Sequence, residues 1–369
     1  MAGFRNPLTD DFYKTRIQKR EEDIRGPYFR DQTAIIHCMA FRRMKKKTQV
    51  FFSPQNDHVC TRIEHSLHVS TIASVICKAL GLDVEMAQAI ALGHDIGHAP
   101  FGHAGEKKLN ELASSSGGFF HEVQSLRVLD RIENDGKGLN LTYAVRDGIV
   151  SHCGEEDDRS LAPCETPKDL DTIQKKGTIP TTYEGCAVRF ADKIAYLGRD
   201  IEDAITANIV KIEDVPETIR DALGGKNGEI IDTLVNDLVH WSLRNQLIGF
   251  SDQKFDLITK LKRFNYDKIY KHEVLAKYIE YVERIIETLF EYLVHHVGEY
   301  QMAFELYRGD HGKLINRIGD YIERRQNAYP LGQFSPLRVV IDYIAGMTDD
   351  YALKAFEEIT LPKPIEFVR

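Results

Sequence analysis

Residues 93–103, GHDIGHAPFGH, concentrate three histidines and an aspartate in a stretch that also contains glycines and a proline. Just upstream, apolar residues recur at helical spacing, at Val84, Ala87, Ile90 and Ala91. Asp83 precedes them and suits a helix N-cap. The pattern predicts a helix that ends at the His94-Asp95 pair, since glycine and proline follow. The loop beyond it can then bring the two later histidines over the same spot.

A second helix is predicted from Thr61 to Leu80. Its apolar stripe is predicted at Ile63, Leu67, Ile72, Val75 and Ile76. Arg62 and His65 lie three residues apart and therefore share a face. A His-Asp dipeptide by itself proves little, because a chain of this composition contains one by chance. The interpretation of the dipeptide therefore depends on its context.

Helical periodicity continues to the C-terminal third of the chain. The predicted helices there span 215–223, 229–246 and 268–297. Strand-like alternation is scarce, so the predicted class is all-α. The stretch 154–180 contains the acidic run Glu155, Glu156, Asp157 and Asp158 followed by prolines, and it predicts a surface loop of unknown role.

The composition limits the classes of function. The chain has 369 residues, 43% of them hydrophobic, and can bury a large core. It has no apolar run of membrane-spanning length and no secretory segment at its N-terminus, so we expect a soluble, cytoplasmic protein. The net charge of −8 disfavours a protein that coats nucleic acid. The six cysteines have no paired spacing, which indicates neither a zinc knuckle nor a disulfide framework.

Six blocks resemble a known family. They are AFRRMKKKTQV (40–50), TRIEHSLHV (61–69), HDIGHAPFGHAGE (94–106), GGFFHEVQSLRV (117–128), ADKIAYLGRDIEDA (191–204) and DYIAGMTDDYAL (342–353). In this order they resemble the HD-domain deoxynucleoside triphosphate triphosphohydrolases, the bacterial dGTPase-like family. The resemblance implies an HD-domain helical core over residues 1–210, with the metal site and phosphate-binding residues. It also implies a helical C-terminal region over 211–369 that packs on this core and completes the substrate pocket.

The resemblance implies that His65, His94, Asp95 and Asp192 bind one divalent metal ion. Nitrogen and oxygen ligands without thiolate suit Mn, Mg, Fe or Co. The spacing alone does not bring Asp192 to the other three ligands.

The other implied roles concern catalysis and the substrate. His103 and Glu106 resemble the catalytic dyad, with His103 as the acid that protonates the departing O5′, and His98 and His121 match phosphate-contacting positions. Arg62 and Lys193 match positions that supply positive charge, and Gln49 matches the residue that reads the sugar 3′-hydroxyl. Tyr196 and Asp200, at i+4 and i+8 from Asp192, would face the triphosphate and sugar. The basic cluster Arg42, Arg43, Lys45, Lys46 and Lys47 is either a further source of positive potential or a solvated face.

Two departures and several alternatives stay open. His121 is followed by Glu122 where many members of the family carry asparagine, which puts an extra carboxylate near a phosphate position. His68 is not carried over as a ligand.

The implied activity is hydrolysis of dGTP or several dNTPs to deoxynucleoside and triphosphate. The alternatives are another HD phosphohydrolase, acting on a monophosphate, a cyclic nucleotide or guanosine tetraphosphate, and a low-turnover dNTP sensor or single-stranded DNA-binding protein.

The resemblance also concerns partners. It implies a homo-oligomer and a possible dNTP effector. In the family, the C-terminal region closes over the substrate, and there this chain has Arg324, Arg325, Tyr329 and Arg338. Each of these is expected more often on the surface or in packing than as a nucleotide ligand.

Overall fold

Helices supply nearly all of the regular structure, which confirms the all-α class. The computed structural model describes residues 3–51, 58–154, 158–309 and 312–361, so Glu155, Glu156 and Asp157 of the acidic run lie outside the described residues. The α-helices are α1 (Asp10–Tyr13), α2 (Gly26–His37), α3 (Met39–Arg43), α4 (Arg62–Leu80), α5 (Val84–Gly93), α6 (Gly102–Leu112), α7 (His121–Arg127), α8 (Glu133–Gly136), α9 (Tyr143–Val150), α10 (Tyr183–Thr206), α11 (Glu217–Leu223), α12 (Asn227–Asn245), α13 (Asp252–Asn265), α14 (Glu273–Tyr300), α15 (Phe304–Tyr307), α16 (Lys313–Arg324), α17 (Pro336–Ala345) and α18 (Asp349–Thr360). A short antiparallel pair, β1 (Ser160–Leu161) with β2 (Ile248–Gly249), joins the 154–180 stretch to the segment after α12.

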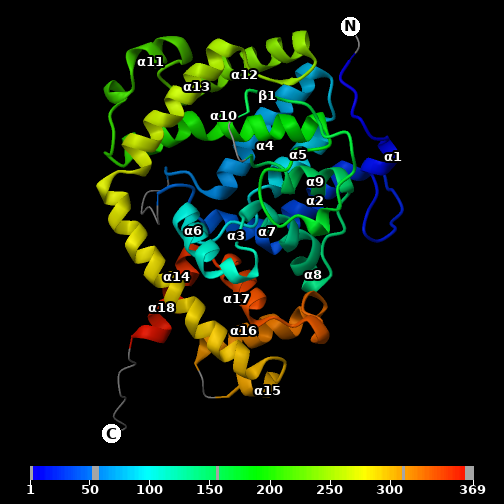
Figure 1. Ribbon diagram of the computed structural model, residues 1–369, viewed down its shortest axis with the longest axis vertical. Helices are drawn as coiled ribbons and strands as arrows, with labels where there is room; N and C mark the ends of the chain where they lie inside the picture. Colours follow the sequence, from blue (N-terminus) through cyan, green and yellow to red (C-terminus); the bar gives the residue numbers. More distant parts are fainter. Residues whose placement is uncertain (1–2, 52–57, 155–157, 310–311, 362–369) are drawn as a thin grey trace.

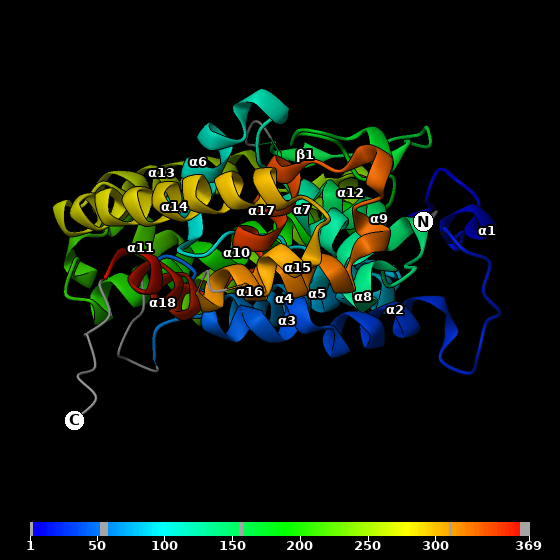
Figure 2. The same ribbon diagram turned by 90° about the horizontal axis from the view of Figure 1, so that it is seen from below.

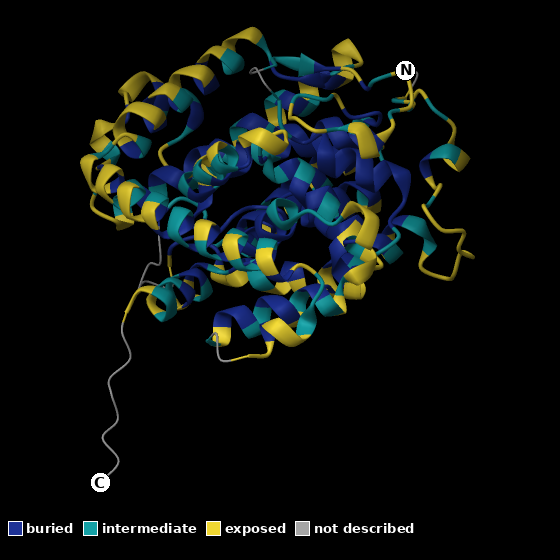
Figure 3. Ribbon diagram, turned by 60° about the horizontal axis from the view of Figure 1, so that its bottom comes forward, coloured by how far each residue is buried: buried dark blue, intermediate teal, exposed yellow. Residues whose placement is uncertain are grey.

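A first hydrophobic core lies around α4, α5 and α10, with α2, α9 and α12 packed on them. In Figure 1 these blue-to-green helices fill the upper part of the molecule. Figure 3 shows the buried residues gathered at the centre and the exposed ones on the outer faces. The predicted start of α5 is confirmed, because the Asp83 carboxylate accepts a hydrogen bond from Met86 N at 3.0 Å. The predicted start of α4 is also confirmed, because Thr61 and Glu64 form a capping box there.

The stripe predicted for α4 is wrong at two positions. Leu67 is 48% and Val75 55% exposed, so both side chains lie on the outer face. The buried face includes His65, Ser66, Val69, Ser70, Ile72, Ala73, Ile76, Cys77 and Leu80. Two neighbours, α5 and α10, cover this face, and small or polar side chains allow the close approach of these helices. The stripe was predicted from hydrophobicity alone, so it included two exposed residues and lay partly off the buried face that contains His65.

A second hydrophobic core joins α6 and the loop before it to α14, α16, α17 and α18. Figures 1 and 2 show α14 running from the first group of helices along the molecule to the orange and red helices near the C-terminus. The helix predicted over 268–297 is interrupted, since residues 266–270 form a π-turn and His272 caps a new helix that begins at Glu273. No helix among the described residues is long and apolar enough to cross a membrane.

The loop between α5 and α6 lies between the two cores and is tied to the C-terminal region. The Asp349 carboxylate, at the start of α18, accepts hydrogen bonds from Phe101 N at 2.9 Å and from Thr48 N at 3.1 Å. Phe101 has φ 66°, in the left-handed region that non-glycine residues rarely adopt. This carboxylate therefore connects two segments, 48–49 and 101–103, that lead directly to predicted site residues.

Candidate active site

One cavity of about 360 Å³ collects most of the predicted site residues. Those that line it are Gln49, Arg62, His65, Asp95, His98, His103, His121, Asp192, Lys193, Tyr196 and Asp200. His94 and Glu106 lie behind this lining, 3.3 Å from Asp95 and 2.8 Å from His121. The cavity has the size of a pocket for a small organic ligand.

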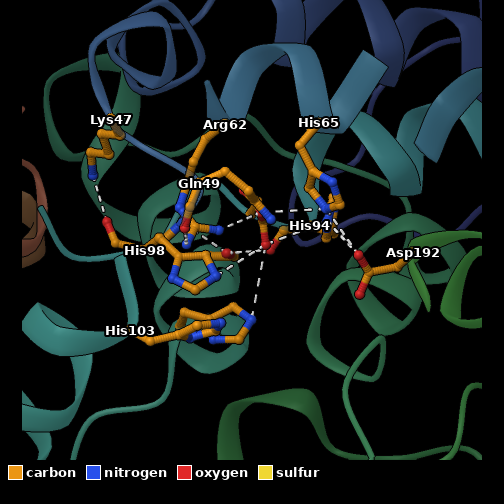
Figure 4. Close-up of polar contacts among 12 residues, drawn as sticks. Lys47, Gln49, Arg62, His65, His94, His98, His103 and Asp192 are labelled. Carbon is orange, nitrogen blue, oxygen red and sulfur yellow. Dashed lines mark hydrogen bonds and ion pairs between the residues drawn. The ribbon is translucent and has the colours of Figure 1, made fainter. Parts of the chain in front are cut away.

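The four predicted metal ligands converge from three helices. His65 comes from α4, the His94-Asp95 pair follows α5, and Asp192 lies on α10. Asp192 Oδ1 lies 2.9 Å from His65 Nε2 and 3.9 Å from His94 Nε2, and Asp95 Oδ1 lies 3.3 Å from His94 Nε2. Figure 4 shows the side chains of His65, His94 and Asp192 turned toward one another. The tertiary structure therefore supplies the proximity of Asp192 that the spacing lacked.

The orientation of His94 fits a bound cation. Its Nδ1 lies 2.6 Å from Ala91 O, and a carbonyl oxygen only accepts, so Nδ1 carries the hydrogen. The buried Nε2 has no hydrogen-bond partner among the described residues and faces the carboxylates of Asp95 and Asp192. A nitrogen lone pair beside two carboxylates is repulsive unless a cation, either a proton on this nitrogen or a metal ion, offsets the carboxylate charge. The donor set of imidazoles and carboxylates suits a borderline or hard divalent ion.

Electrostatics keep these carboxylates ionised. Burial alone would raise the pKa of Asp95, but the interactions of its carboxylate with His94, His98 and Arg62 outweigh burial and hold this pKa well below its usual range. Burial likewise acts to raise the pKa of Asp192, and its hydrogen bond to His65 reverses the effect and lowers it. Both groups are therefore ready to bind a cation without first losing a proton.

Beside the metal ligands, Glu106 contacts three histidines. Its carboxylate lies 2.8 Å from His121 Nδ1, 3.3 Å from His98 Nδ1 and 3.9 Å from His103 Nδ1. The rings of His98 and His121 stack with centroids 3.7 Å apart. Burial would lower the pKa of His121, but the Glu106 carboxylate outweighs it and raises this pKa well above its usual value. His121 is therefore held as an imidazolium next to the cavity.

His103 differs from the other two histidines in its exposure. Its side chain is 77% exposed, and it follows the first residue of α6 at the edge of the cavity. Burial, followed by the charges of Arg62 and His121, lowers the pKa of His98 well below its usual value.

Glu122, the departure from the family pattern, is buried with Oε2 3.5 Å from His121 Nδ1. Its carboxylate thus lies beside His121 and adds negative charge there.

Two predicted substrate residues have polar groups placed for recognition. Arg62 is 1% exposed and donates to Asp95 Oδ2 at 2.7 Å, so part of its charge serves the metal site. The buried Gln49 Oε1 has no hydrogen-bond partner among the described residues. An acceptor desolvated in this way gains from a hydroxyl donor on a ligand.

The polar face of α10 lines the cavity, where the family resemblance places it. Asp192, Lys193, Tyr196 and Asp200 all belong to the lining. Burial raises the pKa of Asp200 to about 6, and the Tyr270 hydroxyl donates a hydrogen bond to its Oδ2. This end of the cavity is therefore less strongly anionic near neutral pH than a free carboxylate would make it.

Sequence reasoning missed several residues of the lining. They are Val50, His152, Cys153, Gly154, Arg189, Lys262, Asn265 and Tyr270. His152 follows α9, outside the six motif blocks, and its place among the other histidines depends on how α9 packs on α5 and α7. Lys262, Asn265 and Tyr270 come from α13 and the π-turn after it, so residues beyond 210 do reach the cavity.

The basic cluster does not act as one patch toward the cavity. Lys47 is 2% exposed and donates to His98 O at 2.5 Å and Ala345 O at 2.6 Å, and burial lowers its pKa to about 7. Arg43 pairs with Glu133 at 3.6 Å. None of the five residues lines the cavity. The cluster is therefore not one solvated face, because Lys47 is buried behind His98 and lies close enough to Asp95 for their charges to interact. A contribution of the other four residues to the positive potential in the cavity stays a prediction.

The aromatic and basic residues of the C-terminal third serve packing instead. Arg338, Tyr329 and Arg127 surround the buried Asp342 carboxylate, at hydrogen-bond distances of 2.7–3.0 Å for Arg127 and 3.0 Å for Tyr329. Arg325 lies over the ring of Tyr321. The contacts of Arg127 with Asp342 join α7 to α17, and none of these residues belongs to the cavity lining.

Comparisons with known proteins agree with the resemblance over most of the chain. The HD domain model matches residues 62–197, and the phosphohydrolase-associated domain model matches residues 248–323 and 304–358. A deoxyguanosinetriphosphate triphosphohydrolase-like protein of Caldanaerobacter subterraneus subsp. tengcongensis is 40% identical over 362 residues, which cover 97% of this chain and 93% of that protein. Proteins of the same name from Desulfatibacillum aliphaticivorans and Clostridium perfringens are 36% and 39% identical, over 98% and 95% of this chain and 96% and 91% of theirs.

Proposed function

This chain belongs to the HD-domain family of deoxyguanosinetriphosphate triphosphohydrolase-like proteins, and on that premise we propose that it hydrolyses deoxynucleoside triphosphates. In the proposed reaction, water adds to the α-phosphorus and the bond from this phosphorus to O5′ breaks. O5′ takes up a proton, and the products are a deoxynucleoside and inorganic triphosphate. The observation that supports this most directly is the cavity where His65, Asp95 and Asp192 meet Arg62, His121 and Gln49.

A divalent ion would be held by His65, His94, Asp95 and Asp192. When bound, such an ion supplies Lewis acidity toward a phosphate oxygen. Mn, Mg, Fe and Co all suit this donor set. The lone pair of His94 Nε2, turned toward both carboxylates, supports this ligand set.

Positively charged side chains of the protein would neutralise the negative charge of the triphosphate that the metal ion does not. We assign Arg62 and Lys193 as fixed positive charges, and His121 as an imidazolium that stabilises negative charge on the phosphates. Glu106 keeps His121 protonated from 2.8 Å away. His98, stacked on His121, is assigned as a second phosphate contact.

Protonation of O5′ is assigned to His103, with Glu106 as its carboxylate partner. Without a proton, the leaving alkoxide is too basic to depart readily, so a positioned acid contributes to the rate. The 3.9 Å between His103 Nδ1 and Glu106 Oε2 is longer than a hydrogen bond, and such pairs often tighten only when substrate binds.

Sugar recognition is assigned to Gln49, Tyr196 and Asp200. The unsatisfied Gln49 Oε1 supports a hydrogen bond from the 3′-hydroxyl, and the Tyr196 ring would leave no room for a 2′-hydroxyl. Rejection of ribonucleotides follows from this assignment.

A substrate panel tests the proposal. The full chain is incubated with Mn²⁺ or Mg²⁺ and each dNTP, alone and in mixtures, in ¹⁸O-labelled water, with GTP, dGMP, a cyclic nucleotide and guanosine tetraphosphate as comparisons. The expected products are deoxynucleoside and triphosphate, with the label in triphosphate. Pyrophosphate, orthophosphate, or label in the nucleoside would refute the proposed bond cleavage, and preferred turnover of another nucleotide class would support the alternative HD phosphohydrolase.

The assembly and regulation implied by the family belong to the same proposal. We propose a homo-oligomer, activation by a second dNTP, and a core and C-terminal region divided near residue 210. Light scattering tests the oligomeric state, and kinetics with mixed dNTPs test activation by a second nucleotide. Competition between a dNTP and single-stranded DNA tests whether the protein also binds single-stranded DNA.

A further inference from the structure

Three donor side chains outside the predicted metal site converge on one wall of the cavity. They are His121 at the start of α7, and His152 and Cys153 directly after α9. His121 Nε2 lies 3.2 Å from His152 Nε2 and 3.4 Å from Cys153 Sγ. One donor atom from each residue lies within 4.8 Å of the other two. The proposed reaction uses neither His152 nor Cys153.

Both imidazoles are oriented as metal ligands usually are. His152 Nδ1 lies 2.7 Å from Ile149 O, which can only accept, so Nδ1 carries a hydrogen and His152 Nε2 is left as the potential ligand atom. His121 Nδ1 lies 2.8 Å from the Glu106 carboxylate. A second ring nitrogen tied to a carbonyl or a carboxylate is the usual arrangement behind a metal-binding histidine, because it sets the ring orientation and tautomer.

The separations match a tetrahedral ion. With bonds of about 2.0–2.1 Å to nitrogen and about 2.3 Å to sulfur, two ligand nitrogens lie about 3.3 Å apart, and a nitrogen and a sulfur about 3.6 Å apart. The observed 3.2 and 3.4 Å differ from these values by about 0.2 Å or less. His121 Nε2 thus needs little movement to share an ion with either partner, and one donor atom from each of the three residues lies within 4.8 Å of the other two.

We propose that His121, His152 and Cys153 form a second metal site that is selective for a thiophilic divalent ion of the Zn²⁺ class. A thiolate is a soft ligand, so this site differs in preference from the imidazole and carboxylate set of the first. Binding replaces the thiol proton of Cys153 and the proton that the His121 imidazolium carries on Nε2; both protons pass to solvent, and no electron is transferred. All three residues line the cavity, so an ion that they hold would lie at its wall.

Occupancy of this site would inhibit the enzyme. The ion takes the Nε2 of His121, which the proposed function assigns to the phosphates, so this consequence rests on that function. Metal binding itself does not depend on it. Activity supported by Mn²⁺ or Mg²⁺ should therefore fall when Zn²⁺ is added.

Cobalt spectroscopy tests the site directly. The full chain is stripped of metal and titrated with Co²⁺, which reports a thiolate ligand through a charge-transfer band in the near ultraviolet. Wild type should bind two ions per chain and show this band, and Cys153→Ser should bind one ion tightly and lack it. Cys164→Ser is the matched control, because Cys164 has similar exposure but its Sγ lies near Thr166 and outside the cavity.

Zn²⁺ affinity gives a second readout. It should fall by about 100-fold or more in Cys153→Ser, and Zn²⁺ inhibition of that variant should weaken in parallel. One ion per chain in wild type, a second ion without the thiolate band, or an unchanged band in Cys153→Ser would each overturn the proposal. The spectra decide the site even if no dNTP is hydrolysed, so its failure is distinguishable from failure of the proposed function.

Discussion

Replacing Asp349 with alanine should weaken both the fold and the handling of substrate. Its buried carboxylate accepts hydrogen bonds from Thr48 N at 3.1 Å, Thr48 Oγ1 at 2.9 Å and Phe101 N at 2.9 Å. Thr48 precedes Gln49, and Phe101 lies two residues before His103. One side chain from α18 therefore determines the relative position of two segments that reach the cavity.

The size of the effect follows from these contacts. Alanine leaves two buried backbone N–H groups without this acceptor, and each such loss costs about 1–3 kcal/mol. Removing a buried carboxylate also relieves its own desolvation, so the net loss in the free energy of unfolding should be about 3 kcal/mol. At roughly 2 °C per kcal/mol for a large domain, Tm should fall by about 6 °C.

Measurements of kcat and KM distinguish a role of Asp349 in positioning the site from a purely structural role. At a temperature well below the transition the variant stays folded, so a purely structural role leaves kcat and KM unchanged. Displacement of the Gln49 and His103 segments should instead lower kcat/KM for a dNTP by at least about tenfold, because small misplacements of reacting groups are costly. Discrimination against the matching ribonucleotide should weaken too.

The control is Asp350→Ala. Asp350 is the next residue, its side chain is 50% exposed, and its carboxylate pairs with Lys46 at 3.6 Å. It should change neither Tm nor kinetics appreciably. A normal Tm for Asp349→Ala would refute the energetic reasoning, and a lowered Tm with unchanged kcat and KM would refute the positioning role.

Three further predictions concern the site. Asp192→Ala should lose bound metal and activity but keep its helix content, because Asp192 faces the other ligands and not a hydrophobic core; retained metal stoichiometry, measured by elemental analysis, would count against its role as a ligand. His103→Ala should keep the metal and lose roughly 100-fold or more in turnover, and unchanged turnover would remove it from the mechanism. Burial raises the pKa of Asp200 from 3.8 to about 6, so the folded state binds this proton more tightly than the unfolded state does. Protonation of Asp200 therefore stabilises the folded state. This contribution to the free energy of unfolding is complete below about pH 4 and is lost as the pH rises through about 6. Relative to Asp200→Asn, wild type should lose of the order of 3 kcal/mol over this range in denaturant unfolding, and parallel pH profiles of the two proteins would contradict the shift.

Local sequence patterns were sufficient for the helical class and for part of the site. The N-cap at Asp83, the helix end at His94-Asp95 and the polar face of Asp192, Tyr196 and Asp200 depend on neighbours within a few turns. Helical periodicity and capping record such local relations. The family motifs then added residue roles that spacing could not supply.

Tertiary structure alone decided which distant side chains meet. The contact of Asp192 with His65 joins residues 127 positions apart, and it exists because α10 packs on α4. The same packing buries the face of α4 with His65 and exposes Leu67, although Leu67 is the more hydrophobic side chain. Likewise, Lys47 is buried rather than solvated because two backbone carbonyls converge on its Nζ.

The histidine cluster illustrates the division most clearly. The motif predicted that histidines would gather near the end of α5, because it places them in one loop. It did not determine that Glu106 would lie closest to His121, or that His152 and Cys153 would join them. Those contacts depend on how α6, α7 and α9 pack, and the distances between helices are set by the side chains that fill both cores, which no local pattern records.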